Sequence, residues 1–116
     1  MSLYDEATPN PAGHRDVQIG QLPVPFPAGV RVVDVREPSE FTGPLGHIAG
    51  AALVPMGAVM AEAHAWDKNA EVLLICKSGG RSSNVAQALT RLGFTKAMNL
   101  VGGMMAWNAA GRPTEK

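Results

Sequence analysis

The stretch Val72-Leu73-Leu74-Ile75-Cys76-Lys77-Ser78-Gly79-Gly80-Arg81-Ser82 decides the fold of this chain of 116 residues. Its first four residues form an uninterrupted apolar run, as expected of a central parallel strand that is covered on both faces. A short loop of small and cationic residues follows. Residues 82–92 then have the spacing of an amphipathic helix, which Ser82 can cap and Gly93 can end.

Short apolar segments alternate with helical ones on both sides of this stretch. The pattern predicts strands at 17–19, 31–35, 51–54, 72–75 and 96–100, and helices near 38–41, 56–66, 82–92 and 103–107. Strands that alternate with helices predict an α/β fold, with a mainly parallel sheet and helices on both faces.

The N-terminal residues 1–16 are polar, contain two prolines and have no hydrophobic period. We therefore expect a flexible tail in which His14 and Arg15 are solvated. Residues 17–116 are expected to form a single domain, since domains most often have ~100–150 residues.

The composition excludes several classes of function. Ten Lys and Arg balance ten Asp and Glu, which argues against a basic surface for nucleic acid or for a membrane. No apolar run approaches the ~18–20 residues of a membrane span, and we expect no secretory signal. The single cysteine excludes an internal disulfide, and we expect a reducing, cytoplasmic compartment. We expect no cofactor, and three scattered histidines predict no metal site.

The position of that cysteine indicates chemistry. Cys76 follows the most apolar strand, and in open α/β sheets ligands bind beyond the carboxyl ends of the strands. Gly79 and Gly80 allow the loop to turn several N–H groups toward one point at a helix N-terminus, which favours an anion. With Lys77 and Arg81 nearby, we expect a thiolate, because thiols in such surroundings have pKa values of roughly 3.5–7.5 instead of ~8.5. The alternative is a buried core cysteine.

Together with further motifs along the chain, this loop resembles that of the single-domain rhodanese-like family, the thiosulfate sulfurtransferases. The motifs that carry the resemblance are Val33–Pro38 with Glu40-Phe41, Gly46-His47-Ile48 with Gly50-Ala51 and Pro55, Cys76–Ser82, and Gly102-Gly103 with Ala106-Trp107. The resemblance implies a three-layer rhodanese-like fold. The chain departs from the family pattern at three places: the longer stretch Thr42–Leu45, Ala49, and the short, proline-rich segment before Val30.

The resemblance also implies a sulfurtransferase. Cys76 would carry a persulfide, taking sulfur from a small anionic donor such as thiosulfate and giving it to cyanide, a thiol or a protein acceptor. Lys77 and Arg81 would orient the donor. Ser78, Gly79, Gly80 and Ser82 would supply main-chain or hydroxyl hydrogen-bond donors.

Two further residues, Asp34 and Arg36, end another predicted strand, and we expect them beside the loop. They either support its shape or form a structural ion pair, for which Arg36 with Glu40 is the candidate. His47 is expected to hold a turn.

Three other functions compete with sulfur transfer. A phosphatase or arsenate reductase loop would place five residues between Cys and Arg, whereas four separate Cys76 from Arg81. A reductase cycle through an internal disulfide needs a second cysteine. A regulatory module, or a persulfide carrier that docks on a protein, would use the same fold without turnover of small molecules.

Overall fold

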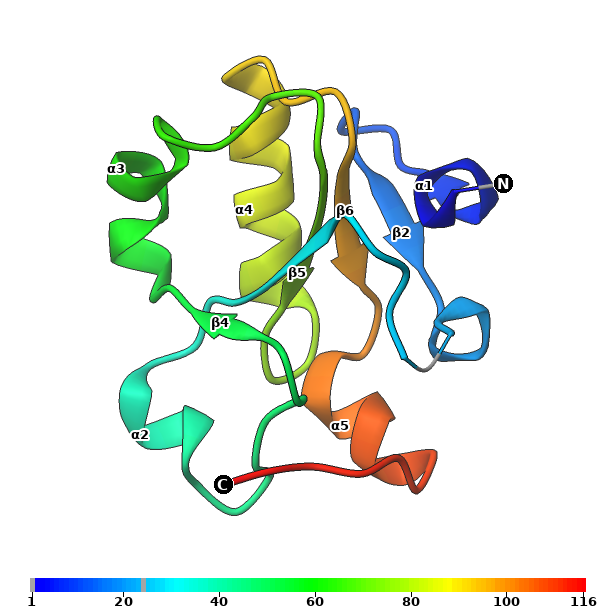
Figure 1. The fold of residues 1–116 in the computed structure, drawn as a ribbon, viewed down its shortest axis with the longest axis vertical. Helices are drawn as coiled ribbons and strands as arrows, with labels where there is room; N and C mark the ends of the chain where they lie inside the picture. Colours follow the sequence, from blue (N-terminus) through cyan, green and yellow to red (C-terminus); the bar gives the residue numbers. More distant parts are fainter. Residues whose placement is uncertain (1, 24) are drawn as a thin grey trace.

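The apolar run is the strand β5 (Glu71–Ile75), which lies inside a six-stranded sheet of order β1-β2-β6-β5-β3-β4 (Figure 1). The structure is a computed structural model that describes residues 2–23 and 25–116. The other strands are β1 (Thr8–Pro9), β2 (Arg15–Val17), β3 (Val30–Asp34), β4 (Ala52–Leu53) and β6 (Ala97–Leu100). All neighbouring pairs are parallel except β1 with β2, which confirms the predicted, mainly parallel sheet.

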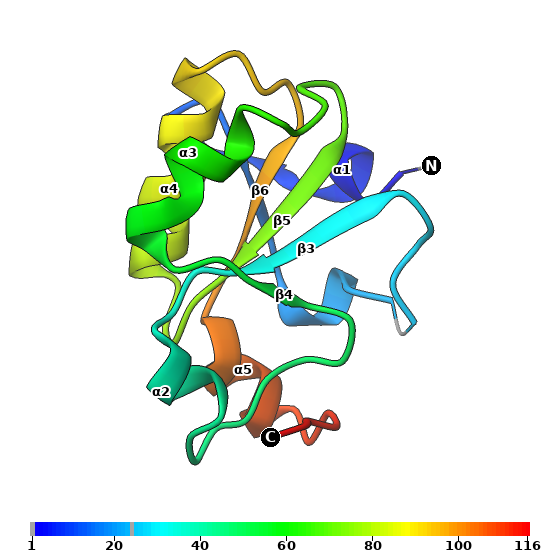
Figure 2. The ribbon, with the colours of Figure 1, turned by 60° about the vertical axis from the view of Figure 1, so that its left-hand side comes forward.

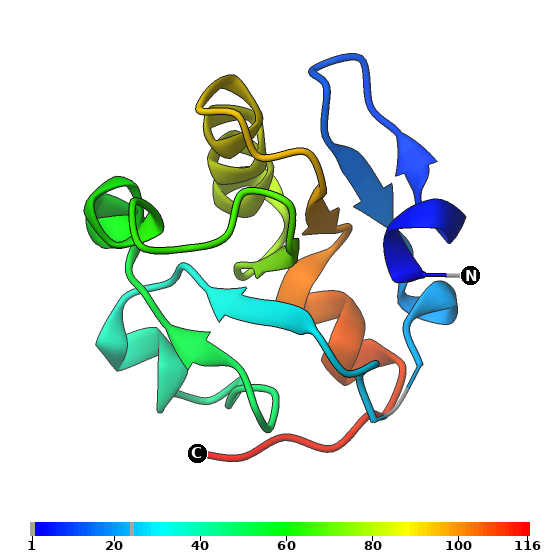
Figure 3. The same cartoon turned by 45° about the horizontal axis from the view of Figure 1, so that its top comes forward.

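Helices cover both faces of the sheet, as Figures 2 and 3 show. The helices α3 (Val59–Ala63) and α4 (Gly80–Arg91) pack on one face, and α1 (Leu3–Glu6) and α5 (Gly103–Ala109) lie on the other. Successive residues of β5 serve the two cores in turn: Leu74 joins the cluster beneath α4, while Leu73 and Ile75 join the cluster with Trp107. This alternation explains the unbroken apolar run, and the three-layer α/β prediction is confirmed.

Residues 2–16, where the sequence led us to expect a flexible tail, contain α1, β1 and the start of β2. The helix α1 buries Leu3, and β2 extends the sheet by pairing with β6, so that Arg15 lies opposite Met98. His14 is buried with 2% of its surface exposed, so its predicted solvation is wrong. Its neighbour Arg15 is half-buried, with its guanidinium over the Tyr4 ring. Pairing with a strand 83 residues further along the chain gives regular structure to a segment that has no apolar period of its own.

The helix expected over 56–66 is shorter than predicted. A 3-10 turn, η2 (Met56–Ala58), precedes α3, and the side chains of Met56 and Met60 are exposed. The remaining short elements are η1 (Ile19–Gln21) and α2 (Pro38–Phe41). None of the helices within residues 2–23 and 25–116 has the length and apolar character needed to cross a membrane.

The carboxyl ends of β3, β5 and β6 meet at one end of the sheet, where α2 and α5 also lie (Figures 1 and 2). The first turn of α5 is joined to the loop after β5, because the amide of Met104 donates to the carbonyl oxygen of Cys76 at 2.9 Å. The neighbouring Gly103 has a φ of +51°, and a Cβ there would overlap that carbonyl oxygen. The glycine therefore allows the close approach that fixes the loop.

Candidate active site

The sulfur of Cys76 lies at the N-terminus of α4, a helix of 12 residues. Gly79 is the N-cap residue with a φ of +104°, and its amide donates to Cys76 Sγ at 3.0 Å. The sequence predicted that Ser82 would cap the helix. In the structure α4 begins two residues earlier, at Gly80, so Ser82 lies within the helix. Its hydroxyl instead turns inward and lies 3.3 Å from the sulfur. The cysteine residue is 1% exposed.

Burial and hydrogen bonding act in opposite directions on the pKa of Cys76. Burial raises the pKa, whereas hydrogen bonds from the Ser82 side chain and from the amides of Ser82, Gly79 and Ser78 lower it. The net pKa lies below the ordinary value of the thiol. Cys76 thus belongs to the buried cluster beneath α4, as the alternative of a core cysteine implies, and it also lies among N–H groups that stabilise its charged form.

Arg81 forms a bidentate ion pair with Glu40 of α2. Its two terminal nitrogens donate to the carboxylate oxygens at 2.7 and 2.8 Å. Hydrogen bonding to Arg81 lowers the pKa of Glu40 from 4.5 to about 2, against the opposing effect of burial. The same hydrogen bond raises the pKa of Arg81 above its usual range. The cation that was expected to be available to a donor therefore already has a carboxylate partner.

We expect this ion pair to make stability depend on pH in acid. A carboxyl group with a lowered folded-state pKa contributes stability that is fully present above pH 4.5 and is lost as the pH falls through about 2. Both side chains are partly exposed, so the contribution should be about 1 kcal/mol or less. The difference in unfolding free energy between the native protein and Glu40→Gln should therefore shrink from pH 5 to pH 2 in urea titrations. The exposed Glu62→Gln is the control, and a difference that stays constant with pH would contradict the assignment.

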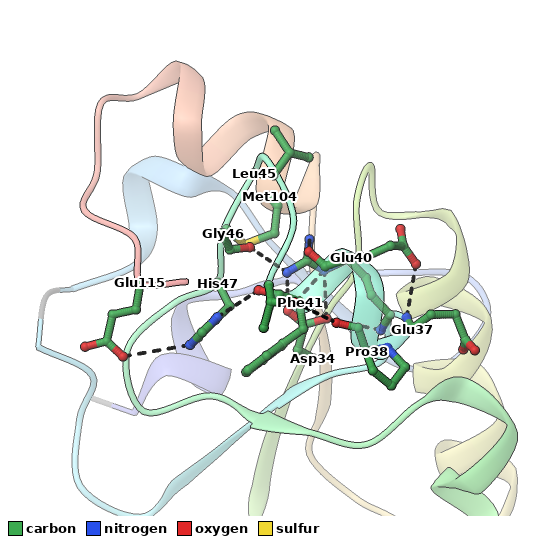
Figure 4. A network of polar contacts seen from close by, with 12 residues as sticks. Asp34, Glu37, Pro38, Glu40, Phe41, Leu45, Gly46, His47, Met104 and Glu115 are labelled. Atoms are coloured by element: carbon green, nitrogen blue, oxygen red, sulfur yellow. Dashed lines mark hydrogen bonds and ion pairs between the residues drawn. The ribbon is translucent and has the colours of Figure 1, made fainter.

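Asp34 and Arg36, which the sequence suggested as supporting residues, bind each other. Arg36 Nη2 donates to Asp34 Oδ2 at 2.8 Å and Nε donates to Oδ1 at 2.9 Å, and both side chains are 1% exposed. The expected pair of Arg36 with the Glu40 carboxylate is not formed, since Nη1 instead donates to the main-chain oxygen of Glu40 at 3.2 Å. Nη2 also donates to Gly46 O at 2.7 Å, and Figure 4 shows Asp34, Glu40 and Gly46 gathered at this point. The pair thus ties β3 to α2 and to the loop after it.

His47 holds the end of that loop. Its Nδ1 lies 2.8 Å from Phe41 O, its ring stacks on the ring of Phe41, and Nε2 lies 3.8 Å from Glu115 Oε1 (Figure 4). The contacts of His47 are therefore those of a residue that holds a turn.

A cavity of about 310 Å³ opens beside the cysteine loop. It is lined by Arg36, Glu40, Pro44, Leu45, Lys77 and Met105. The longer stretch Thr42–Leu45 thus contributes two apolar residues to one wall. The exposed Lys77 is the cationic member of the lining that has no ion-pair partner among the described residues. Ser78 and Gly80 are also exposed, at the outer rim of the loop.

Sequence reasoning missed two polar residues behind the sulfur. Asn99 of β6 is 5% exposed and accepts a hydrogen bond from Ser82 Oγ at 2.5 Å. Asp16 of β2 accepts one from Asn99 Nδ2 at 3.4 Å. A single amide in an otherwise apolar strand was the available signal for Asn99, whereas Asp16 fell in the segment expected to be a tail.

Comparison with known proteins identifies the family. The family description "Rhodanese-like domain" matches residues 25–110, so the chain belongs to the rhodanese-like domain family. It is 35% identical over 102 residues to thiosulfate sulfurtransferase 16, chloroplastic, of Arabidopsis thaliana, covering 76% of this chain and 82% of that protein. The putative sulfur carrier protein YrkF of Bacillus subtilis is 37% identical over 78 residues, which are 67% of this chain but only 41% of YrkF.

A solved structure shows the same fold. The crystal structure of a rhodanese-like domain protein from Staphylococcus aureus superposes with a TM-score of 0.73 and 29% identity. The match covers 87% of this chain and 98% of the Staphylococcus chain. The α/β rhodanese fold predicted from the motifs is thereby confirmed.

Proposed function

We propose that the protein is a sulfurtransferase that carries sulfur as a persulfide on Cys76. The observation that carries the proposal is the set of hydrogen-bond donors aimed at the only cysteine, at the N-terminus of α4. Such a site stabilises a thiolate, which is the nucleophile. The names of the relatives, a thiosulfate sulfurtransferase and a sulfur carrier, support the same chemistry.

The proposed sulfur transfer has two steps. The Cys76 thiolate attacks the outer sulfur of thiosulfate, a new S–S bond forms, and the S–S bond of thiosulfate breaks with its electron pair leaving on sulfite. Cyanide or an acceptor thiolate then attacks the outer sulfur of the persulfide. Thiocyanate or a new persulfide leaves, and the Cys76 thiolate is regenerated.

In this proposal the residues of the cysteine loop have different roles. The amides of Ser78, Gly79 and Ser82 hold the negative charge of the sulfur, because they already lower the pKa of Cys76. Lys77 attracts the anionic donor to the cavity beside the loop, and Gly80 leaves room at its rim. Arg81 can bind the anionic sulfur donor only in competition with the Glu40 carboxylate. It therefore contributes less to binding of that donor than the resemblance implies.

Asp34 and Arg36 act as supports in the same scheme. They hold the loop after α2, whose residues Pro44 and Leu45 form the cavity wall. The burial of the sulfur favours an acceptor that reaches it with a single small atom, such as cyanide or a thiol. A reducing compartment, as in the cytoplasm, suits this cycle because the lone cysteine must be regenerated as a thiolate.

A protein acceptor is a second candidate for the last step. The apolar wall of the cavity, formed by Pro44, Leu45 and Met105, supports it, since such surfaces accept a side chain of a partner. In that case persulfide formation is unchanged and only the acceptor differs.

A loading reaction without acceptor tests the proposal. Protein mixed with thiosulfate alone should release sulfite in a rapid burst that approaches one molecule per chain and then stops, as a covalent intermediate requires. Cys76→Ser should give no burst, and addition of cyanide should restore continuous release. Absence of a burst from the folded native protein, with no release after cyanide, would contradict the proposed activity.

A further inference from the structure

The hydroxyl of Ser82 lies within reach of three hydrogen-bond acceptors. Its oxygen is 3.3 Å from Cys76 Sγ, 3.3 Å from the carbonyl oxygen of Gly79 and 2.5 Å from Asn99 Oδ1. Ser82 is fully buried, so water does not supply further donors. A serine hydroxyl has one proton, and only one of these acceptors can receive it at a time.

The orientation of the Asn99 amide decides which acceptor receives the proton. Asn99 Nδ2 donates to Asp16 Oδ1 at 3.4 Å, and Asn10 Nδ2 donates to the other carboxylate oxygen of Asp16 at 2.9 Å. A carboxylate only accepts, so the NH₂ end of Asn99 faces Asp16 and its carbonyl end faces Ser82. The distance of 2.5 Å to Asn99 Oδ1, against 3.3 Å to Cys76 Sγ, then indicates that Asn99 competes with the sulfur for the Ser82 proton.

We propose that Asn99, anchored by Asp16, is a positioning residue that withholds the Ser82 proton from Cys76 and so limits the nucleophilicity of the empty site. The thiol form fits this arrangement, because S–H can donate to Ser82 Oγ. A thiolate needs the Ser82 proton for itself, and taking it leaves a buried carbonyl oxygen of Asn99 without a donor, which costs free energy.

The persulfide form fits the arrangement as well, and this part of the inference rests on the proposed function. The inner sulfur of a persulfide has neither a proton nor a charge, so Ser82 can keep its hydrogen bond to Asn99. The charge lies on the outer sulfur, which the main-chain amides stabilise. The Asn99–Asp16 pair therefore favours the loaded protein over the free thiolate.

The anchor lies outside the matched part of the family domain, which begins at residue 25. Asp16 belongs to β2, in the N-terminal segment that the sheet orders, and His14 Nε2 lies 3.5 Å from its Oδ1. The other charged groups around the sulfur are engaged elsewhere: Arg81 pairs with Glu40, and Arg36 pairs with Asp34. Lys77 is exposed at the loop rim. Competition between Asn99 and Cys76 for the Ser82 proton therefore affects the nucleophilicity of Cys76 separately from these charged groups.

Alkylation of the only cysteine by iodoacetamide, followed from pH 5 to pH 10, tests the inference without any sulfur donor. Asn99→Leu removes the competing acceptor and should speed alkylation about tenfold at pH 6, since a hydrogen bond to a charged group is typically worth at least that factor. Asp16→Ala frees the amide to turn and should act in the same direction. Ser82→Ala should slow the reaction, and the neighbouring Ser83→Ala is the matched control.

The double variant Asn99→Leu with Ser82→Ala separates a positioning role from a general structural effect. The inference requires that the gain from Asn99→Leu disappear when Ser82 is absent. An equal gain in both backgrounds would overturn it, as would an unchanged or slower profile in both Asn99→Leu and Asp16→Ala. If Asn99→Leu fails to fold, Asp16→Ala decides, because that side chain is partly exposed. Failure of the sulfite burst leaves this alkylation result unaffected.

Discussion

Replacing Cys76 by Ser reduces sulfur transfer from thiosulfate to cyanide to the uncatalysed background, a loss that we expect to be about 10³-fold or more. The reason is that the chain has no second cysteine to carry the sulfur. A serine hydroxyl keeps the size of the side chain but is not ionised at neutral pH, so the amides of the loop have no anion to stabilise. Thiocyanate formation is the measurement.

The control for this variant is its stability. The hydroxyl of Ser at position 76 can still accept from the amide of Gly79, so urea unfolding of Cys76→Ser should follow that of the native protein closely. A folded variant that forms thiocyanate at the native rate would refute the persulfide mechanism.

The second large effect is expected for Arg36→Met. The substitution leaves the carboxylate of Asp34, which is 1% exposed, without its cationic partner. Removing one member of a buried pair typically costs about 3–5 kcal/mol, because the remaining charge is desolvated and unpaired. The main-chain oxygens of Glu40 and Gly46 lose their donors as well. Urea unfolding at pH 7 should show the loss.

Arg31→Met is the matched control for that experiment. Arg31 lies on β3, which ends two residues before Arg36, but it is exposed, with its guanidinium 4.8 Å from the centre of the Trp66 ring. A cation–π contact at an exposed site is worth about 0.5–1 kcal/mol. If Arg36→Met cost no more than Arg31→Met, the buried pair would not be the support that its geometry indicates.

The core of the fold could be predicted from sequence because its signals are local. The apolar run of β5 must be buried on both faces, and the glycines after it permit a sharp turn into α4. The same local pattern places Cys76 at a helix N-terminus, and the resemblance to the family adds the roles of the loop residues.

The partners of the charged residues could not be predicted in this way. Two arginines, Arg36 and Arg81, contact Glu40. The Glu40 carboxylate pairs with Arg81, which is 41 residues away in sequence. Asp16 meets Asn99 across 83 residues because β2 pairs with β6, and nothing in residues 1–16 signals that pairing. Contacts of this kind depend on the assembled sheet.

The mass of the intact protein after exposure to thiosulfate tests the central claim most directly. The account predicts a gain of about 32 Da, the mass of one sulfur atom, on a peptide that contains Cys76, and its loss on treatment with cyanide. Cys76→Ser should gain nothing under the same conditions. A native protein that releases sulfite but keeps its original mass, or that carries the added sulfur on another residue, would contradict the account.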